Sequence, residues 1–86
     1  MEFRRSKTFI KAYASLNLQQ QKQVEAAVSL FAEDRSNPAL RDHPMKGKMK
    51  GYRSLSAAWD LRIIYRQEGD YMIIILINVE THNQVY

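Results

Sequence analysis

Apolar residues recur at intervals of three or four positions in two segments of the N-terminal third of the chain, residues 9–14 and 24–32. This spacing is typical of helices with one buried face. Ser6 is a suitable N-cap for the first helix. Asn17, with a glutamine three residues later, resembles a capping box that begins the second. The second helix should end near Arg35, where a Ser-Asn-Pro turn follows. The pattern predicts an αα-hairpin that covers another layer of structure.

The remainder of the chain changes to the pattern of a sheet. Runs rich in β-branched and aromatic residues predict three strands after a loop that contains glycine and proline, and a Gln-Glu-Gly-Asp turn joins the last two. A short edge strand is expected at the N-terminus. The chain is therefore predicted to be an α+β domain. The expected strands are residues 2–5, 52–57, 61–66 and 72–79, the loop is 39–51 and the turn is 67–70.

Side-chain alternation indicates which face of the sheet carries polar groups. In the strand that begins at Leu61, alternate apolar residues point one way, whereas Asp60 and Arg62 point the other. The last predicted strand is apolar on both faces, as a central strand should be. Strict alternation puts its Asn78 on the same face as Leu76. We therefore expect one face to lie under the helices and the other to present Asp60 and Arg62 beside a basic loop.

Composition narrows the class of protein. The 86 residues, 45% of them hydrophobic, make a single domain, 1–86. The chain has no cysteine, which favours the cytoplasm and excludes a cysteine nucleophile and a zinc–thiolate site. Two histidines are too few for a histidine-rich metal centre, so no metal or other cofactor is expected. The N-terminus lacks the apolar region of a signal peptide. The apolar run 71–77 is far shorter than the ~20 residues that cross a bilayer, so no membrane partner is expected.

Charge is unevenly spread along the chain. The net charge is +4, yet residues 41–66 hold seven Lys or Arg against two Asp, and residues 67–86 hold three acidic residues and no Lys or Arg. A basic centre of this kind fits a polyanion such as nucleic acid. It equally fits the solvated surface of an alkaline protein, and charge alone leaves both interpretations open.

Five short motifs now follow one another in an informative order: His-Pro-Met-Lys-Gly at 43–47, Gly-Tyr-Arg at 51–53, Asp-Leu-Arg-Ile-Ile-Tyr-Arg at 60–66, Thr-His at 81–82, and a terminal Tyr86. Together they resemble the RelE/ParE toxin superfamily, most closely its YafQ-like branch, over nearly the whole chain. The resemblance implies an N-terminal αα-hairpin packed on a twisted antiparallel sheet. It also implies a toxin of a type II toxin–antitoxin system: a metal-independent endoribonuclease that cleaves mRNA, often at the ribosome. A cognate antitoxin protein would block it.

The resemblance also implies which residues form the catalytic site. His43 and Asp60 match positions tied to catalysis, His82 matches the histidine of the Thr-His element, Arg62 resembles an arginine of RelE-like strands, and Tyr86 stands where the family has an aromatic. Metal-free RNA cleavage needs a base for the 2′-OH, an acid for the leaving oxygen and cations around the phosphorane. We assign the proton transfers to the two histidines, an orienting role or alternate base to Asp60, phosphate binding to Arg62 and Lys46, and base stacking to Tyr86. Further contacts with the RNA backbone are expected from Lys48, Lys50 and Arg53.

The sequence departs from the YafQ-like pattern at four positions. Ser56 replaces a second histidine, Leu61 a tryptophan, Asn78 an arginine and Glu80 a glycine. The loss of an imidazole and a guanidinium, and the added negative charge of Glu80 beside a phosphate site, predict weakened activity.

Some of these residues also have a purely structural interpretation. Asp60 paired with Arg62 or Arg53 would be an ordinary surface salt bridge, and Trp59 and Tyr65 are interpreted as core residues. Two other functions also fit the scaffold: a non-enzymatic, ParE-like inhibitor of DNA gyrase, and a degenerate toxin that binds its antitoxin but cuts poorly. The presence of two histidines favours the ribonuclease, because a pure binding module needs no proton-transfer groups.

Overall fold

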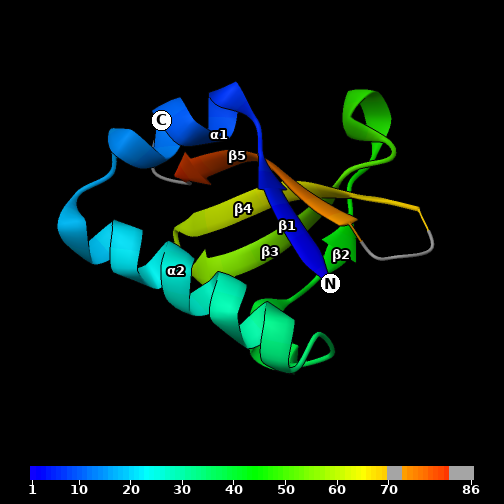
Figure 1. Ribbon diagram of the computed structural model, residues 1–86, viewed down its shortest axis with the longest axis horizontal. Coiled ribbons are helices and arrows are strands. Elements are labelled where there is room, and N and C mark those ends of the chain that lie inside the picture. The colour runs from blue at the N-terminus through cyan, green and yellow to red at the C-terminus, as the bar shows by residue number, and fades with distance from the viewer. Residues whose placement is uncertain (70–72, 82–86) are drawn as a thin grey trace.

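The computed structural model describes residues 1–69 and 73–81, in which two helices cover one face of a five-stranded sheet (Figure 1). The strand order is β1-β5-β4-β3-β2. The three pairs from β5 to β2 are antiparallel, and β1 adds parallel to β5. The α+β class is confirmed. The sheet is mixed and not wholly antiparallel, because the edge strand β1 runs parallel to β5. The elements are β1 (Glu2–Arg5), α1 (Lys7–Ala14), α2 (Leu18–Glu33), β2 (His43–Pro44), β3 (Arg53–Ala58), β4 (Leu61–Glu68) and β5 (Ile73–Thr81), with 3₁₀ turns η1 (Pro38–Leu40) and η2 (Gly47–Met49).

Both predicted helix starts are confirmed. The Ser6 hydroxyl accepts a hydrogen bond from the Phe9 backbone N–H at 3.0 Å and donates one to the Ile77 carbonyl at 2.7 Å, so the cap also ties α1 to β5. Asn17 and Gln20 form the reciprocal capping box that begins α2. These caps satisfy backbone N–H groups that would otherwise lack partners at the start of each helix.

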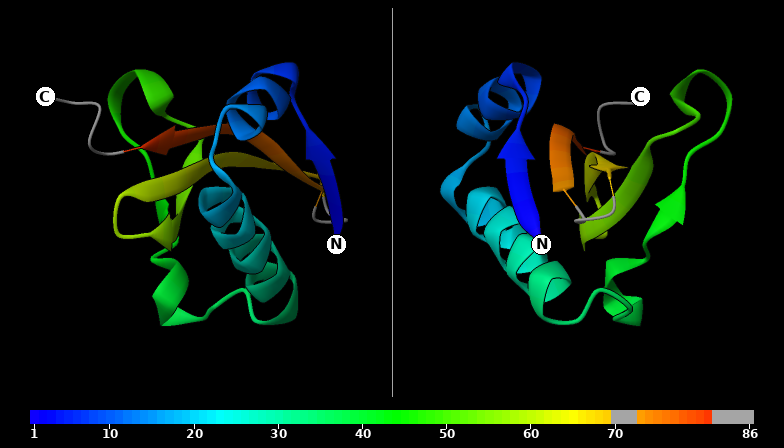
Figure 2. Two further views of the ribbon diagram at one scale, coloured as in Figure 1. Left: turned by 90° about the vertical axis from the view of Figure 1, so that its left-hand side faces the viewer. Right: turned by 45° about the vertical axis from the view of Figure 1, so that its right-hand side comes forward.

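The hydrophobic core lies between the helices and the sheet, on the face that both helices cover (Figure 2). Its centre is an edge-to-face pair of Phe31 and Tyr65, whose ring centroids are 5.3 Å apart. Tyr65 is fully buried, as expected from the sequence. The buried cluster consists of Phe9, Val24, Ala27, Phe31, Leu40, Leu55, Leu61, Ile63, Tyr65, Ile74, Leu76 and Val79.

The placement of Asn78 differs from the expectation. Tyr65 pairs with Leu76 but Ile64 pairs with Asn78, so the register shifts by one residue in β5. Such a β-bulge reverses the alternation beyond it, which turns Asn78 away from the core face. The prediction that Asn78 shares a face with Leu76 is therefore wrong. The same shift brings Glu80 opposite Arg62 on the open face of the sheet.

The segment predicted to be a loop contains a short strand that closes the sheet. In β2, His43 pairs with Ser54 of β3. Arg41, just before it, has a left-handed backbone with φ of 48°, and this turns the chain from η1 toward the sheet. The pairing with Ser54 therefore puts His43 on the open face of the sheet, away from the helices. Among the described residues, the longest helix is too short and too polar to cross a membrane.

Candidate active-site cleft

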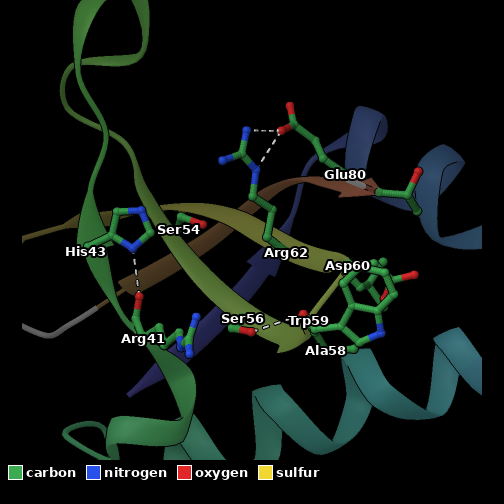
Figure 3. A pocket seen from close by; sticks show the side chains of 11 residues that line it. Arg41, His43, Ser54, Ser56, Ala58, Trp59, Asp60, Arg62 and Glu80 are labelled. Atoms are coloured by element: carbon green, nitrogen blue, oxygen red, sulfur yellow. Dashed lines mark hydrogen bonds and ion pairs between the residues drawn. The ribbon is translucent and has the colours of Figure 1, made fainter. Parts of the chain in front are cut away.

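A cleft of about 330 Å³ opens on the face of the sheet that the helices leave uncovered. It exists because β3 presents small side chains there, among them Ser54 and Ser56, whereas the neighbouring strands present the taller His43 and Arg62. Figure 3 shows these two tall side chains on opposite sides of the serines. A floor of small residues between polar walls leaves room for part of a ligand such as one nucleotide.

His43 is held in a defined orientation at one wall of the cleft. Its Nδ1 lies 2.7 Å from the Arg41 carbonyl oxygen, as the dashed line in Figure 3 marks. A carbonyl only accepts hydrogen bonds, so in the neutral ring Nδ1 carries the hydrogen and Nε2 keeps its lone pair. The exposed imidazole of His43 is thus set up to accept a proton through Nε2.

Arg62 forms the opposite wall and is engaged by Glu80. Its Nε and Nη2 donate to one oxygen of the Glu80 carboxylate at 2.9 and 2.6 Å. The side chains are 45% and 38% exposed, so solvent screens this ion pair. Among the described residues, the charged groups that line the cleft are two arginines, Arg41 and Arg62, and two acids, Asp60 and Glu80, whose formal charges cancel.

Asp60 lines the cleft at the tip of the β3–β4 hairpin. The salt-bridge interpretation of this residue is wrong, because Arg62 pairs with Glu80 and Arg53 pairs with Asp42. The Asp60 carboxylate therefore lines the cleft and forms a salt bridge with neither Arg62 nor Arg53.

A second polar cluster anchors the strand that carries His43. The Tyr65 hydroxyl donates to Asp42 at 2.7 Å, and Arg53 Nε donates to Asp42 at 3.0 Å and to the Tyr65 oxygen at 3.1 Å. Burial, reinforced by the hydrogen bond to the Asp42 carboxylate, raises the pKa of Tyr65 to about 12. The cluster links the residue before His43 to β3 and β4, and so fixes the position of the imidazole.

The structure brings together only part of the predicted site. His43, Asp60 and Arg62 line one cleft. Arg53 is committed to the Asp42–Tyr65 cluster, and its side chain does not line the cleft. The predicted residues His82 and Tyr86 lie outside the described residues. The predicted RNA contacts Lys46, Lys48 and Lys50 are exposed around η2, beyond β2 and outside the cleft lining.

Sequence reasoning did not assign Arg41 or Trp59 to the site, although both line the cleft. The assignment of Trp59 to the core is wrong, because its side chain is 87% exposed. A signal was present: Trp59 and Asp60 lie between two consecutive predicted strands, 52–57 and 61–66, and the tips of hairpins project into solvent. Arg41 carried no comparable signal, because its place depends on the left-handed turn after η1.

The fold is that of a class of small bacterial toxins. The YoeB/ParE toxin from Agrobacterium tumefaciens superimposes with a TM-score of 0.78 at 18% identity, covering 95% of this chain and 99% of that one. YafQ from E. coli gives 0.73 at 20% identity, covering 99% and 97%. The toxin in the E. coli DinJ–YafQ toxin–antitoxin complex gives 0.70 at 21% identity, covering 99% and 96%.

A family model identifies the branch of this class. The model described as "Bacterial toxin of type II toxin-antitoxin system, YafQ" matches residues 1–86, so the chain belongs to the YafQ family of bacterial type II toxins. No curated protein sequence matches the chain significantly.

Proposed function

We propose that this YafQ-family toxin is a metal-independent endoribonuclease that cleaves mRNA at the ribosome, in the cytoplasm. The observation that carries the proposal is the common cleft in which His43, Asp60 and Arg62 meet. The cleft combines a proton acceptor, a carboxylate and a guanidinium, which are the groups that an internal attack on phosphorus requires.

In the proposed reaction, His43 Nε2 removes the proton from the ribose 2′-OH, and the 2′ oxygen attacks the adjacent phosphorus. The bond from phosphorus to the 5′ oxygen breaks, and a general acid protonates that leaving oxygen. His82 is the proposed acid; it follows Thr81, which lines the cleft. Asp60 orients a histidine or serves as an alternate base, and Tyr86 stacks on a base beside the cut.

Arg62 stabilises the phosphate as charge builds on its oxygens. The guanidinium then exchanges the Glu80 carboxylate for phosphate oxygens, which are bound by the same planar fork of donors. Lys46, Lys48, Lys50 and Arg53 are proposed to contact the RNA backbone more remotely. We also propose that a cognate antitoxin blocks this surface, as the E. coli relative is found in complex with DinJ.

The Arg62–Glu80 ion pair favours a second candidate, a degenerate toxin that retains its antitoxin but cleaves RNA weakly. In that protein Glu80 would keep Arg62 permanently from the substrate, and the balanced charges of the cleft would give RNA little attraction. The two candidates differ in whether RNA displaces Glu80.

Induction of the toxin in growing cells, followed by mapping of mRNA 5′ ends, tests the proposal. Arg62→Ala should lower the frequency of cuts ~10²- to 10³-fold, as for the loss of a positioned transition-state donor. His43→Ala and His82→Ala should each lower it ~10²- to 10⁴-fold.

The matched control is Arg66→Ala, which removes the same kind of side chain from β4 outside the cleft and should leave the cuts unchanged. Intact messages together with gyrase-linked DNA damage would refute the ribonuclease. Equal cutting by wild type and Arg62→Ala would remove the arginine from the mechanism.

A further inference from the structure

Trp59 is a large aromatic side chain held in solvent at the rim of the cleft. It is 87% exposed and lies at the tip of the β3–β4 hairpin, as Figure 3 shows. Full exposure of an indole forgoes the stabilisation that its burial would provide, and an exposed aromatic beside a cleft commonly serves binding. Its position is well defined by the hairpin itself.

Local contacts fix the hairpin that presents Trp59. Ala58 pairs with Leu61 on either side of the two-residue tip, and the register shifts between Ser56 and Ala58, in the last residues of β3. The Ser56 hydroxyl spans this shift by donating to the Ala58 carbonyl at 3.1 Å. A platform on a rigid hairpin loses little conformational entropy when a ligand stacks on it.

Trp59 is also shared between two cavities. It lines the active-site cleft and a neighbouring cavity of about 330 Å³ that includes Ala39, Ser56 and Ala57. Arg41 lines both cavities as well. The two cavities therefore share an aromatic side chain and a guanidinium, and Arg41 also contacts His43 through its carbonyl oxygen.

We propose that Trp59 is a stacking platform for a base of single-stranded RNA next to the cleaved bond, with Arg41 binding the phosphate of that nucleotide. The inference rests on the proposed ribonuclease function and adds a substrate-binding subsite to it. Aromatic side chains and arginines are the usual partners of unpaired bases and their phosphates. Stacking would place the adjoining phosphate in the cleft between His43 and Arg62.

The surroundings of Trp59 favour RNA over a protein partner as its occupant. Protein-binding tryptophans usually lie within an apolar patch that excludes water. Trp59 is instead surrounded in its two cavities mainly by alanine, serine and charged residues. Within residues 1–69 and 73–81, the other exposed large apolar residues are Met1, Ile10 and Leu18, which belong to the N-terminal segment and the helices.

Fluorescence tests the proposal directly, because Trp59 is the only tryptophan in the chain. The probe is a short single-stranded RNA with 2′-O-methyl groups, which cannot be cleaved by 2′-OH attack. Titration should quench the emission saturably, whereas inorganic polyphosphate should bind without quenching. Because Trp59→Ala lacks this emission, its affinity is measured by the anisotropy of a dye-labelled oligonucleotide, and it should be weaker than that of wild type about 5- to 150-fold, as a lost base stack of ~1–3 kcal/mol predicts. Trp59→Phe should retain part of the affinity that Trp59→Ala loses.

The control variant is Leu18→Ala, which removes another exposed apolar side chain, on α2, and should bind as wild type does. Trp59→Ala should fold normally because so little of the indole is buried, and far-UV circular dichroism checks this. An unquenched titration, or unchanged affinity in Trp59→Ala, would overturn the stacking subsite even if RNA is still cleaved. If the wild-type protein cuts no mRNA in cells, the ribonuclease function itself is refuted, so the two failures are distinguishable.

Discussion

The pairing of Arg62 with Glu80 makes Glu80→Gln the most informative substitution in the molecule. An exposed ion pair of this kind contributes ~0.2–1 kcal/mol, and a substrate phosphate must replace it. A carboxylate left ~6 Å from a phosphate in water adds ~0.7 kcal/mol of repulsion. Glutamine removes both terms while keeping the shape of the side chain. The change should therefore favour RNA binding by ~1–1.7 kcal/mol, or about 5- to 20-fold.

The assay is the affinity for the same uncleavable RNA oligonucleotide, with the rate of cleavage of a ribosome-bound message measured alongside. Both should rise in Glu80→Gln, and the gain should shrink as salt is added because the effect is electrostatic. Glu68→Gln is the matched control. It breaks the exposed 3.5 Å ion pair of Glu68 with Arg66 on β4, outside the cleft. An equal gain in both variants would show a general charge effect, and a loss of cleavage in Glu80→Gln would refute the reasoning by giving Glu80 a catalytic role.

Two further predictions concern stability. The folded protein raises the pKa of Tyr65 from 10.0 to about 12, so between these pH values it keeps a proton that the unfolded chain releases. The contribution of the neutral Tyr65 hydroxyl to the free energy of unfolding is therefore present below pH 10 and is lost as the pH rises toward 12. Urea unfolding across that window should show a fall of up to ~2–3 kcal/mol that is smaller in Tyr65→Phe; identical pH profiles would contradict it. Asn17→Ala should lower the free energy of unfolding by ~0.5–2 kcal/mol and Asn17→Ser by much less, since serine retains the capping oxygen; equal losses in the two variants would deny the capping box its role.

Local pattern was sufficient for most of the secondary structure. The caps at Ser6 and Asn17 and the helical spacing that follows them are properties of neighbouring residues, and the structure confirms both. The helix predicted to end near Arg35 ends at Glu33, a difference within the ordinary uncertainty of helix ends. The loop prediction for 39–51 overlooked η1, η2 and β2, because strand β2 exists only through its pairing with β3.

The candidate site was predictable only where the family motifs named a residue. His43, Asp60 and Arg62 were assigned by resemblance, and the structure gathers them around one cleft. The partners of the arginines were not predictable, because Arg53–Asp42 and Arg62–Glu80 join residues far apart in the sequence. Composition suggested a cationic site, but among the described residues that line the cleft two arginines are matched by two acids.

The sequence by itself determined the α+β class, the helical hairpin, the central strands and the residue types available for RNA chemistry, because periodicity and capping act over a few neighbouring positions. Only the tertiary structure decided which residues share a face. The bulge in β5 shifts the alternation by one residue, so Glu80 meets Arg62 and Asn78 leaves the core face. The tip of the β3–β4 hairpin holds Trp59 in solvent, although hydrophobicity alone would bury it. The first outcome depends on the register between β4 and β5, which lie apart in the chain. The second depends on the pairing of Ala58 with Leu61, which leaves Trp59 at the tip of the hairpin.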